Sequence, residues 1–148
     1  MFTENRTGPE RRENHAESLT ENRFLDRRAR AQAIVRNAEH LLPEERALAR
    51  AYFVEGMSAS EVARLAGTTP KTVLRRIDRM VARVTSLRFV FAVNHRKSLG
   101  RMRGRVATAC LVQGLSMRET SRRFGVSIYV VRSHLHAVNG MFDRITRD

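Results

Sequence analysis

The chain has 148 residues, of which 28 are Lys or Arg and 15 are Asp or Glu, so its formal net charge at pH 7 is +13. It has no apolar run long enough to span a bilayer and no apolar signal-peptide core near its start, and its single cysteine excludes an internal disulfide. We therefore expect a protein of the reducing cytoplasm, without membrane contact and associated with the nucleoid, that binds a polyanion.

Positive charge gathers toward the C-terminal half. Residues 1–40 are close to neutral, with eight basic and seven acidic side chains, whereas residues 101–148 carry nine basic and three acidic side chains, a net charge of +6. Nearly all the cations are arginines, which suit bidentate contacts to phosphates and guanine edges. Because a GC-rich genome would also enrich arginine, charge alone favours a nucleic acid only modestly.

The first forty residues divide into two parts. Residues 1–20 are polar and predict a flexible arm, with a tail that reaches DNA or a partner as the alternative. Residues 21–40 carry apolar side chains at three- and four-residue steps, which predicts an N-terminal amphipathic helix. We expect this helix to pack on the first unit, with a dimerisation helix as the alternative. Its apolar positions are Phe24, Leu25, Ala31, Ile34, Val35, Ala38, Leu41 and Leu42.

Residues 41–88 predict a unit of three helices, called the first unit below. Its first helix opens at Leu42-Pro43-Glu44-Glu45, because proline suits the first helical position and acids suit the positive end of the helix dipole, and it ends near Gly56. Paired carboxylates also suit acid–base catalysis, but at a helix start we interpret Glu44 and Glu45 as partners of the dipole.

The second and third helices of the first unit are separated by Gly67. The second begins at a capping box formed by Ser58 and Glu61, and Gly67 permits the positive φ of a tight turn. Thr69-Pro70 is an N-cap followed by proline, which starts the third helix. The small Ala63 allows the two helices to approach closely. The side chains expected to face inward are Val62, Leu65, Ala66, Val73 and Ile77.

Residues 89–100 form the predicted connector, and the most apolar patch in the chain runs from the end of the first unit into it. The spacing of this patch fits either a continuing helix or a short strand. Its side chains could form core between the two units or a homodimer interface, and both interpretations stay open. The apolar side chains are Val84, Leu87, Phe89, Val90, Phe91 and Val93.

Residues 101–148 repeat the plan of the first unit at a shift of 58 positions and form the second unit. Ser116 and Glu119 form its capping box, Gly125 its turn, and Ser127 its second cap. Val106, Ala107, Cys110 and Leu111 belong to its first helix, Val131 and Leu135 are expected to be buried, and Val138, Met141, Phe142 and Ile145 extend the last helix to the terminus. Cys110 falls on the buried stripe of the first helix and is expected to be an inert core thiol.

A short helix, a glycine turn and a second helix are typical of a helix-turn-helix motif, whose second helix reads the major groove of DNA. The predicted fold is therefore all-α, with two tandem helix-turn-helix units and an N-terminal helix. The predicted readers are Pro70–Met80 and Ile128–Val138. Their DNA-facing candidates are Thr69, Lys71, Thr72, Arg75 and Arg76 in the first unit, and Ser127, Tyr129, Val130, Arg132, Ser133 and His134 in the second. Arg64, Arg122 and Arg123 are better placed for phosphates.

The first unit resembles region 4 of bacterial sigma-70-type factors, in Leu42-Pro43-Glu44-Glu45-Arg46, Tyr52 to Ser58 and Glu61-Val62-Ala63-Arg64-Leu65-Ala66-Gly67. The second unit, from Gly114-Leu115-Ser116 to Val131-Arg132-Ser133-His134-Leu135, resembles the same superfamily, which includes response-regulator DNA-binding domains. The resemblance implies a helix-turn-helix that reads promoter DNA. The chain departs from the family at Thr68, Leu74 and Ser121, and it has nothing like the sigma region that melts DNA, so we do not expect a complete sigma factor.

We therefore expect a sequence-specific regulator of transcription that binds double-stranded DNA with two recognition helices, the second being the stronger reader. The alternatives are a sigma region 4 mimic that binds RNA polymerase and an architectural protein that binds DNA without base preference. The sequence contains no glycine-rich phosphate loop and no nucleophile with a base, so we do not expect an enzyme, and we expect no cofactor. His134 and His136 do not predict a metal site, because side chains two positions apart on a helix diverge.

Overall fold

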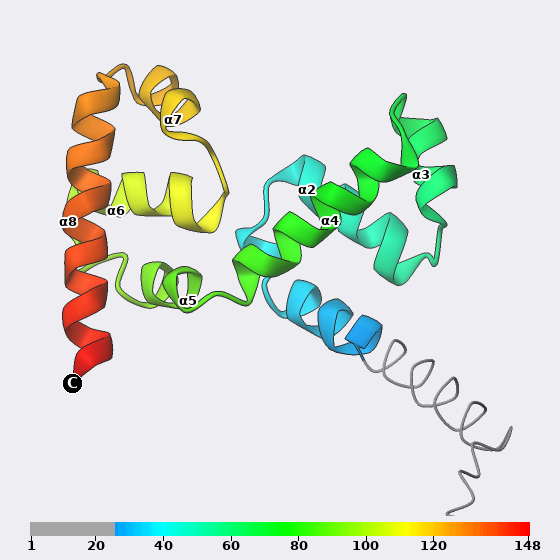
Figure 1. The fold of residues 1–148 in the computed structure, drawn as a ribbon, viewed down its shortest axis with the longest axis horizontal. Coiled ribbons are helices and arrows are strands. Elements are labelled where there is room, and N and C mark those ends of the chain that lie inside the picture. Colours follow the sequence, from blue (N-terminus) through cyan, green and yellow to red (C-terminus); the bar gives the residue numbers. More distant parts are fainter. Residues whose placement is uncertain (1–25) are drawn as a thin grey trace, which may run out of the picture.

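The computed structural model of the chain describes residues 26–148 (Figure 1). These residues form helices and no strand, which confirms the predicted all-α class. The predicted arm, residues 1–20, and the start of the N-terminal helix lie outside the described residues. Residues 26–36 are helical. The further elements are η1 (Ala38–His40), α2 (Pro43–Ala49), η2 (Arg50–Val54), α3 (Ala59–Ala66), α4 (Pro70–Val84), α5 (Leu87–Asn94), α6 (Arg101–Ala107), η3 (Thr108–Val112), α7 (Met117–Phe124) and α8 (Ile128–Arg147).

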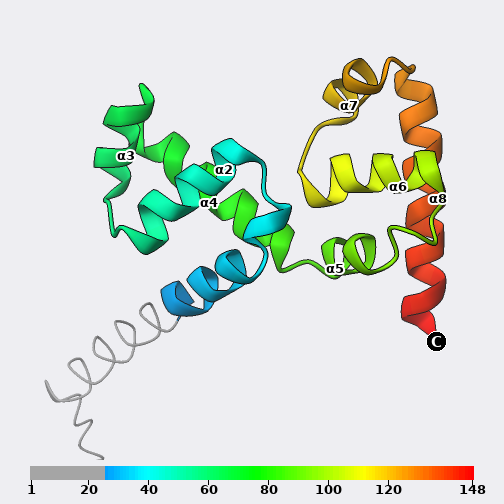
Figure 2. The ribbon, with the colours of Figure 1, turned by 180° about the vertical axis from the view of Figure 1, so that it is seen from behind.

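The repeat in the sequence is also a repeat in the structure. Each of α2, η2, α3 and α4 begins 58 residues before its counterpart among α6, η3, α7 and α8. The two sets of helices lie on opposite sides of the molecule, and α4 and α8 both begin at the same edge, the upper one in Figure 1. Figure 2 shows from behind that α5 lies between the end of α4 and the C-terminal half of α8. The connector is thus a structural part of the junction between the units.

The first helix of each unit ends in a π-helical turn, and in the first unit the helix stops shortly before Gly56, as predicted. In η2 the N–H of Glu55 donates to the carbonyl of Arg50 at 2.9 Å, and in η3 the N–H of Gln113 donates to Thr108 at 2.8 Å. Each of these hydrogen bonds spans five residues, one more than in an α-helix. A glycine with positive φ follows the π-helical turn in both units. Nothing in the apolar spacing of the sequence distinguishes such a turn from an α-helix.

The main hydrophobic core crosses the junction. It joins Ile34 of the N-terminal helix, Met80 of α4, Phe89 and Phe91 of α5, and Val138 of α8, all of them buried. The apolar patch is helical and contains no strand: Val84 ends α4, and the rest of the patch lies in α5, which Ser86 caps by accepting from the N–H of Phe89 at 3.2 Å. Only part of it is core, because Leu87 and Val90 are exposed.

The N-terminal helix packs on the first unit, as expected. Arg30 pairs with Asp78 of α4, and the guanidinium of Arg27 lies 5.0 Å from the ring centre of Tyr52. Ile34 is buried, but the prediction that Val35 lies on the packed face is wrong, since the helix covers only one narrow side and Val35 is exposed. In the last helix, Val131 is buried as predicted, whereas Leu135 is only half-buried. Met141 and Phe142 are half-buried as well, and Ile145 is exposed.

Candidate nucleic-acid interface

A left-handed glycine joins the two short helices of each unit. Gly67 has φ 65° and ψ 36°, and Gly125 has φ 64° and ψ 33°, so α3 meets α4 and α7 meets α8 through the same turn. Thr69 and Ser127 cap the helices that follow, each accepting at 3.2 Å from the backbone N–H three residues on. The predicted glycine turns and N-caps are confirmed in both units.

The predicted capping boxes differ between the units. In the second unit both halves are present: Ser116 accepts from the N–H of Glu119 at 3.1 Å, and Glu119 accepts from the N–H of Ser116 at 3.2 Å. In the first unit the Ser58 hydroxyl accepts from the N–H of Glu61 at 3.1 Å, but no returning bond from Glu61 is present. The first helix is therefore capped by serine alone.

The residues beneath the two turns also differ. In the first unit, Val62 and Ala63 are buried against α4. Their counterparts Thr120 and Ser121 bring hydroxyls into the same place, yet both hydroxyls are satisfied. Thr120 donates to the carbonyl of Ser116 at 2.8 Å and Ser121 to that of Val126 at 2.5 Å. The replacement of the small Ala63 of the first unit by Ser121 is thus compensated within the turn itself.

The outer face of α4 presents cations. Lys71, Arg75 and Arg76 are exposed, and within residues 26–148 no carboxylate lies within 4.0 Å of them. Asp78, the one acid on this helix, pairs with Arg30 instead. Thr69 is exposed as well, while Thr72 is half-buried and its hydroxyl lies 2.9 Å from that of Thr69. The candidates of the first unit thus spread around the start of α4, with Lys71 and Arg76 about 140° apart round the helix.

The candidates of the second unit divide between two helices. On α7, Arg122 and Arg123 are exposed, as is their counterpart Arg64 on α3. At the start of α8, the exposed side chains are Ser127, Tyr129, Arg132 and Ser133, whereas Val130 and His134 are half-buried. Among the described residues, none of these arginines has a carboxylate within 4.0 Å. In the second unit, therefore, α7 carries the paired arginines, and the exposed side chains at the start of α8 are mostly uncharged and polar.

Two leucines of the first unit are exposed where the second unit has arginine. Leu65 is 74% exposed and Leu74 is 42% exposed, and their counterparts 58 positions on are Arg123 and Arg132. The prediction that Leu65 and Ala66 face inward is wrong. Both lie on the same side of α3 as the buried Val62, but they stand in its last turn, where they line a cavity and not packed core.

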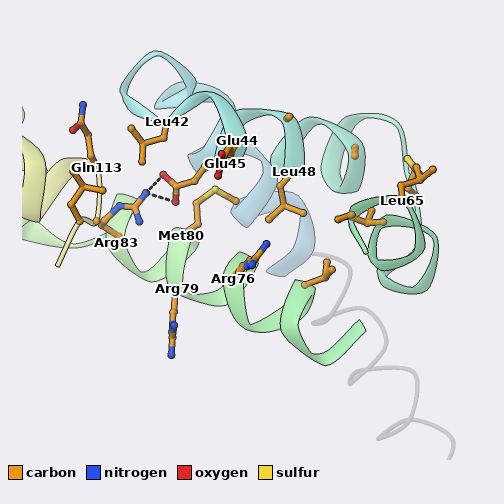
Figure 3. Close-up of a pocket in the computed structure, with 18 of the residues that line it drawn as sticks. Leu42, Glu44, Glu45, Leu48, Leu65, Arg76, Arg79, Met80, Arg83 and Gln113 are labelled. Atoms are coloured by element: carbon orange, nitrogen blue, oxygen red, sulfur yellow. Dashed lines mark hydrogen bonds and ion pairs between the residues drawn. The ribbon is translucent and has the colours of Figure 1, made fainter. Parts of the chain in front are cut away.

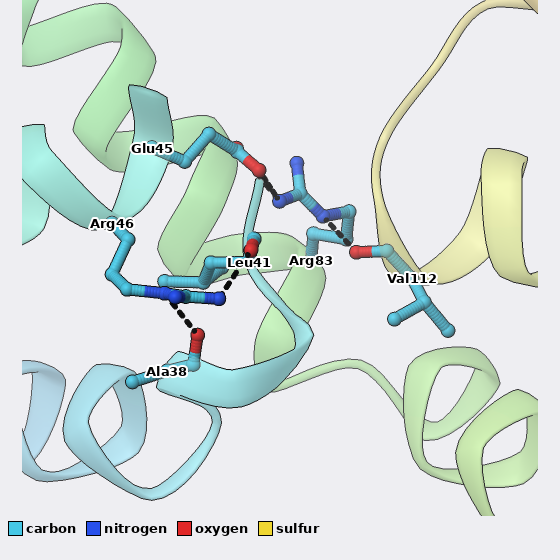
Figure 4. Close-up of polar contacts among 6 residues, drawn as sticks. All are labelled: Ala38, Leu41, Glu45, Arg46, Arg83 and Val112. Atoms are coloured by element: carbon cyan, nitrogen blue, oxygen red, sulfur yellow. Dashed lines mark hydrogen bonds and ion pairs between the residues drawn. The ribbon is translucent and has the colours of Figure 1, made fainter. Parts of the chain in front are cut away.

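A cavity of about 810 Å³ separates α2 and α4 of the first unit from the loop that precedes α7 (Figure 3). Leu42, Leu48 and Met80 form apolar parts of its wall, and Arg76 and Glu44 lie at its polar parts. At one end Arg83 binds Glu45 and the backbone of the second unit (Figure 4). Glu45 does stand at the start of α2 as predicted, but its role as partner of Arg83 has no sequence signal.

Cys110 is half-buried, and its sulfur lies 3.4 Å from the hydroxyl of Thr120. Burial raises the pKa of the Cys110 thiol above its ordinary value, and the hydrogen bond from Thr120 lowers it by less. The thiol is therefore protonated at neutral pH, which suits the predicted packing role. Within residues 26–148 no three His, Cys, Asp or Glu side chains are grouped to hold a metal ion. None of the helices in that range is long and apolar enough to cross a membrane.

Comparisons of the chain with models of protein families, with curated proteins and with solved structures find no match.

Proposed function

We propose that the chain is a sequence-specific regulator of transcription that binds double-stranded DNA. In this proposal α3–α4 and α7–α8 are two helix-turn-helix pairs, and α4 and α8 enter the major groove. The observation that carries it is the recurrence, 58 residues apart, of a capped helix, a left-handed glycine and a second capped helix with polar and cationic side chains at its exposed start. A helix held by a preceding helix at a fixed angle is what groove reading requires.

The exposed side chains suggest distinct roles in the two units. On α4, Lys71, Arg75 and Arg76 are positioned to neutralise phosphates or to donate to guanine. On α8, Arg132 is the one arginine in the first two turns, so a bidentate contact to guanine is its proposed role. Arg122 and Arg123 precede the turn and would hold the backbone beside that contact. Two readers in one chain would occupy major-groove faces about 10–10.5 base pairs apart.

The test is selection of bound duplexes from random DNA, followed by a salt titration on the selected sequence and on a scrambled duplex of the same composition. We expect an enriched motif, an affinity for it well above that for the scrambled duplex, and a steep loss of affinity with salt, because each neutralised phosphate releases counterions. Equal affinity for both duplexes would instead favour the architectural function, and the proposal of sequence-specific reading would fail.

The exposed leucines favour a second candidate, in which the first unit binds a protein such as RNA polymerase and the second unit binds DNA. Leu65 and Leu74 present apolar surface at positions where the second unit presents arginine. Large exposed aliphatic side chains suit a protein partner better than a phosphate backbone. The paired variants Leu65→Ala and Leu74→Ala distinguish the candidates. Loss of a polymerase complex with unchanged DNA affinity favours the protein partner, and loss of DNA affinity contradicts it.

A further inference from the structure

One side chain, that of Arg83 at the end of α4, links three separate segments of the chain (Figure 4). Its Nη2 lies 2.7 Å from both carboxylate oxygens of Glu45 in α2. Its Nε donates to the carbonyl of Val112, the last residue of η3, at 2.8 Å. A reader helix of the first unit is thereby attached both to its own unit and to the backbone of the second unit.

This contact is shielded from water. The side chain of Arg83 is 16% exposed and that of Glu45 is 23% exposed. Charge-assisted hydrogen bonds are stronger in such surroundings than at a solvated surface. Because the N–H groups of a planar guanidinium point in fixed directions, Arg83 also restricts the angle between α2, which carries Glu45, and η3, which carries Val112. The carbonyl of Val112 is available because carbonyls at the end of a helical segment lack helical partners.

Gly114 leaves the space that the guanidinium of Arg83 occupies in this contact. A Cβ on Gly114 would lie 2.2 Å from Nη1 of Arg83, whereas a Cβ on its counterpart Gly56 would have nothing within 4 Å. The φ angles of the two glycines are nearly equal, +72° and +69°. Gly56 is therefore required for its backbone conformation alone, while Gly114 is required for its conformation and for the space that Arg83 occupies.

The contact does not belong to the repeat. At a shift of 58 positions Arg83 corresponds to Met141, and Glu45 corresponds to Arg103, so α8 and α6 hold no equivalent ion pair. Elsewhere the junction consists mainly of apolar side chains, among them Met80 of α4 and Phe89 of α5. A second ion pair at the junction, between Arg88 of α5 and Asp143 of α8, is 3.9 Å long and half exposed, so it constrains the geometry much less than the Arg83 contact does. Apolar packing is non-directional, so the directional contact of Arg83 is the part of the junction that specifies an angle.

We infer that Arg83 is a positioning residue that holds α4 and α8 in one relative orientation, so that the protein accepts a single spacing between its two DNA half-sites. This inference rests on the proposed function for the DNA spacing, but the fixed orientation itself is a property of the free protein. A chain whose units turned independently would bind half-sites at several spacings, because each added base pair rotates the second site about the duplex by roughly a tenth of a turn.

The orientation is tested first without DNA. Ser60 and Arg118 are exposed and occupy equivalent positions in the two units. Each is replaced by a spin-labelled cysteine (S60C and R118C) in a chain whose native thiol is removed by C110S. The distance between the two labels is measured by pulsed electron paramagnetic resonance. We expect one narrow distance distribution, broadened by Arg83→Met. Arg36→Met is the matched control, because Arg36 is exposed on the N-terminal helix and has no described partner.

Gly114→Ala and Gly56→Ala provide a second route should Arg83→Met fail to fold. Both introduce the same backbone strain, but only Gly114→Ala displaces Arg83. Broadening with Gly114→Ala and not with Gly56→Ala supports the inference. A distribution that stays narrow in both Arg83→Met and Gly114→Ala overturns it, whatever the protein does with DNA.

The spacing is then tested on duplexes in which the two selected half-sites are separated by added or removed base pairs. The parent chain should lose about tenfold or more in affinity for one added base pair, whereas Arg83→Met should bind the spacing series with affinities within about threefold. Retention of the parent's preference by Arg83→Met overturns the inference. Failure of the parent chain to select any half-site contradicts the proposed function, and the DNA-free distances still decide the role of Arg83.

Discussion

The first and second units share their turns and N-caps, yet they place positive charge differently. In the first unit the cations lie on the reader itself, at Lys71, Arg75 and Arg76, and the exposed face also carries leucines. In the second unit the first two turns of α8 carry a single arginine, Arg132, and the supporting helix α7 before it carries three arginines, among them Arg122 and Arg123. Glycine and cap residues maintain the backbone plan, whereas outward side chains change without cost to the core.

This difference suggests a division of roles that follows from the proposed function. A reader bearing several cations grips the phosphate backbone strongly but discriminates poorly between bases. A reader bearing one arginine among polar groups, as α8 does with Arg132, Ser133 and Tyr129, suits base edges. The first unit would then position the protein on DNA, and the second would supply most of its specificity.

The largest expected effect is on stability, at the glycine after each π-helical turn. Gly56→Ala should lower the free energy of unfolding by about 1–2 kcal/mol, because an L residue is strained at positive φ. Gly114→Ala should cost about 2 kcal/mol more, since it also displaces Arg83 and leaves Glu45 without its partner in a half-buried place. Urea unfolding of the two variants measures the difference, and equal losses would show that the contact of Arg83 is energetically unimportant.

The next effect concerns DNA affinity at one pair of equivalent positions. Arg132→Ala should weaken binding to the selected sequence by about 1–3 kcal/mol and relax the preference at one or two base positions. Leu74→Ala, at the equivalent place on α4, should change affinity by no more than a few tenths of a kcal/mol if that side chain does not contact DNA. Binding titrations on the selected duplex and its single-base variants measure both. Uniform weakening across all sequences by Arg132→Ala would assign Arg132 to phosphate.

The charge on the supporting helix predicts a salt effect. Replacing Arg122 and Arg123 together by glutamine should reduce the slope of log affinity against log salt by about 0.9 for each lost phosphate contact, with the base preference unchanged. Arg36→Gln removes a charge outside both units and serves as the control. An unchanged slope in the double variant would place α7 away from the DNA backbone.

The smallest effect concerns the caps of α3 and α7. Ser58→Ala and Ser116→Ala should each cost about 1 kcal/mol of stability, because the helix loses a side-chain acceptor for one of its free N–H groups. The loss should be a few tenths of a kcal/mol larger for Ser116→Ala, which also breaks the reciprocal capping box with Glu119. Thermal unfolding of the two variants ranks them, and a larger loss at Ser58 would contradict this ranking.

Local signals in the sequence predicted the parts of the fold that depend on a few adjacent residues. Proline at position 43, serine and threonine caps, and the turns at Gly67 and Gly125 are recognisable because a single residue type satisfies each backbone requirement. The shift of 58 residues added a second, independent copy of each signal. These are the features that the structure reproduces.

Features that depend on tertiary packing were not predictable. Arg83 looks like any solvated cation of α4 in the sequence, and its partners lie 38 and 29 residues away in different segments. The outward position of Leu65 follows from how little of α3 is covered, and the π-helical turns have no signature in apolar spacing. The DNA-facing candidates do lie at the exposed starts of α4 and α8, but exposure does not by itself distinguish base contacts from phosphate contacts.

Chemical footprinting of the guanine N7 positions tests most directly whether both units enter the major groove. On the selected duplex we expect two protected patches in the major groove, centred about 10–10.5 base pairs apart on one face of the DNA. Arg132→Ala should weaken protection in only one of them. A single protected patch would show that only one of the two units reads DNA, and the proposal of two reader helices would fail.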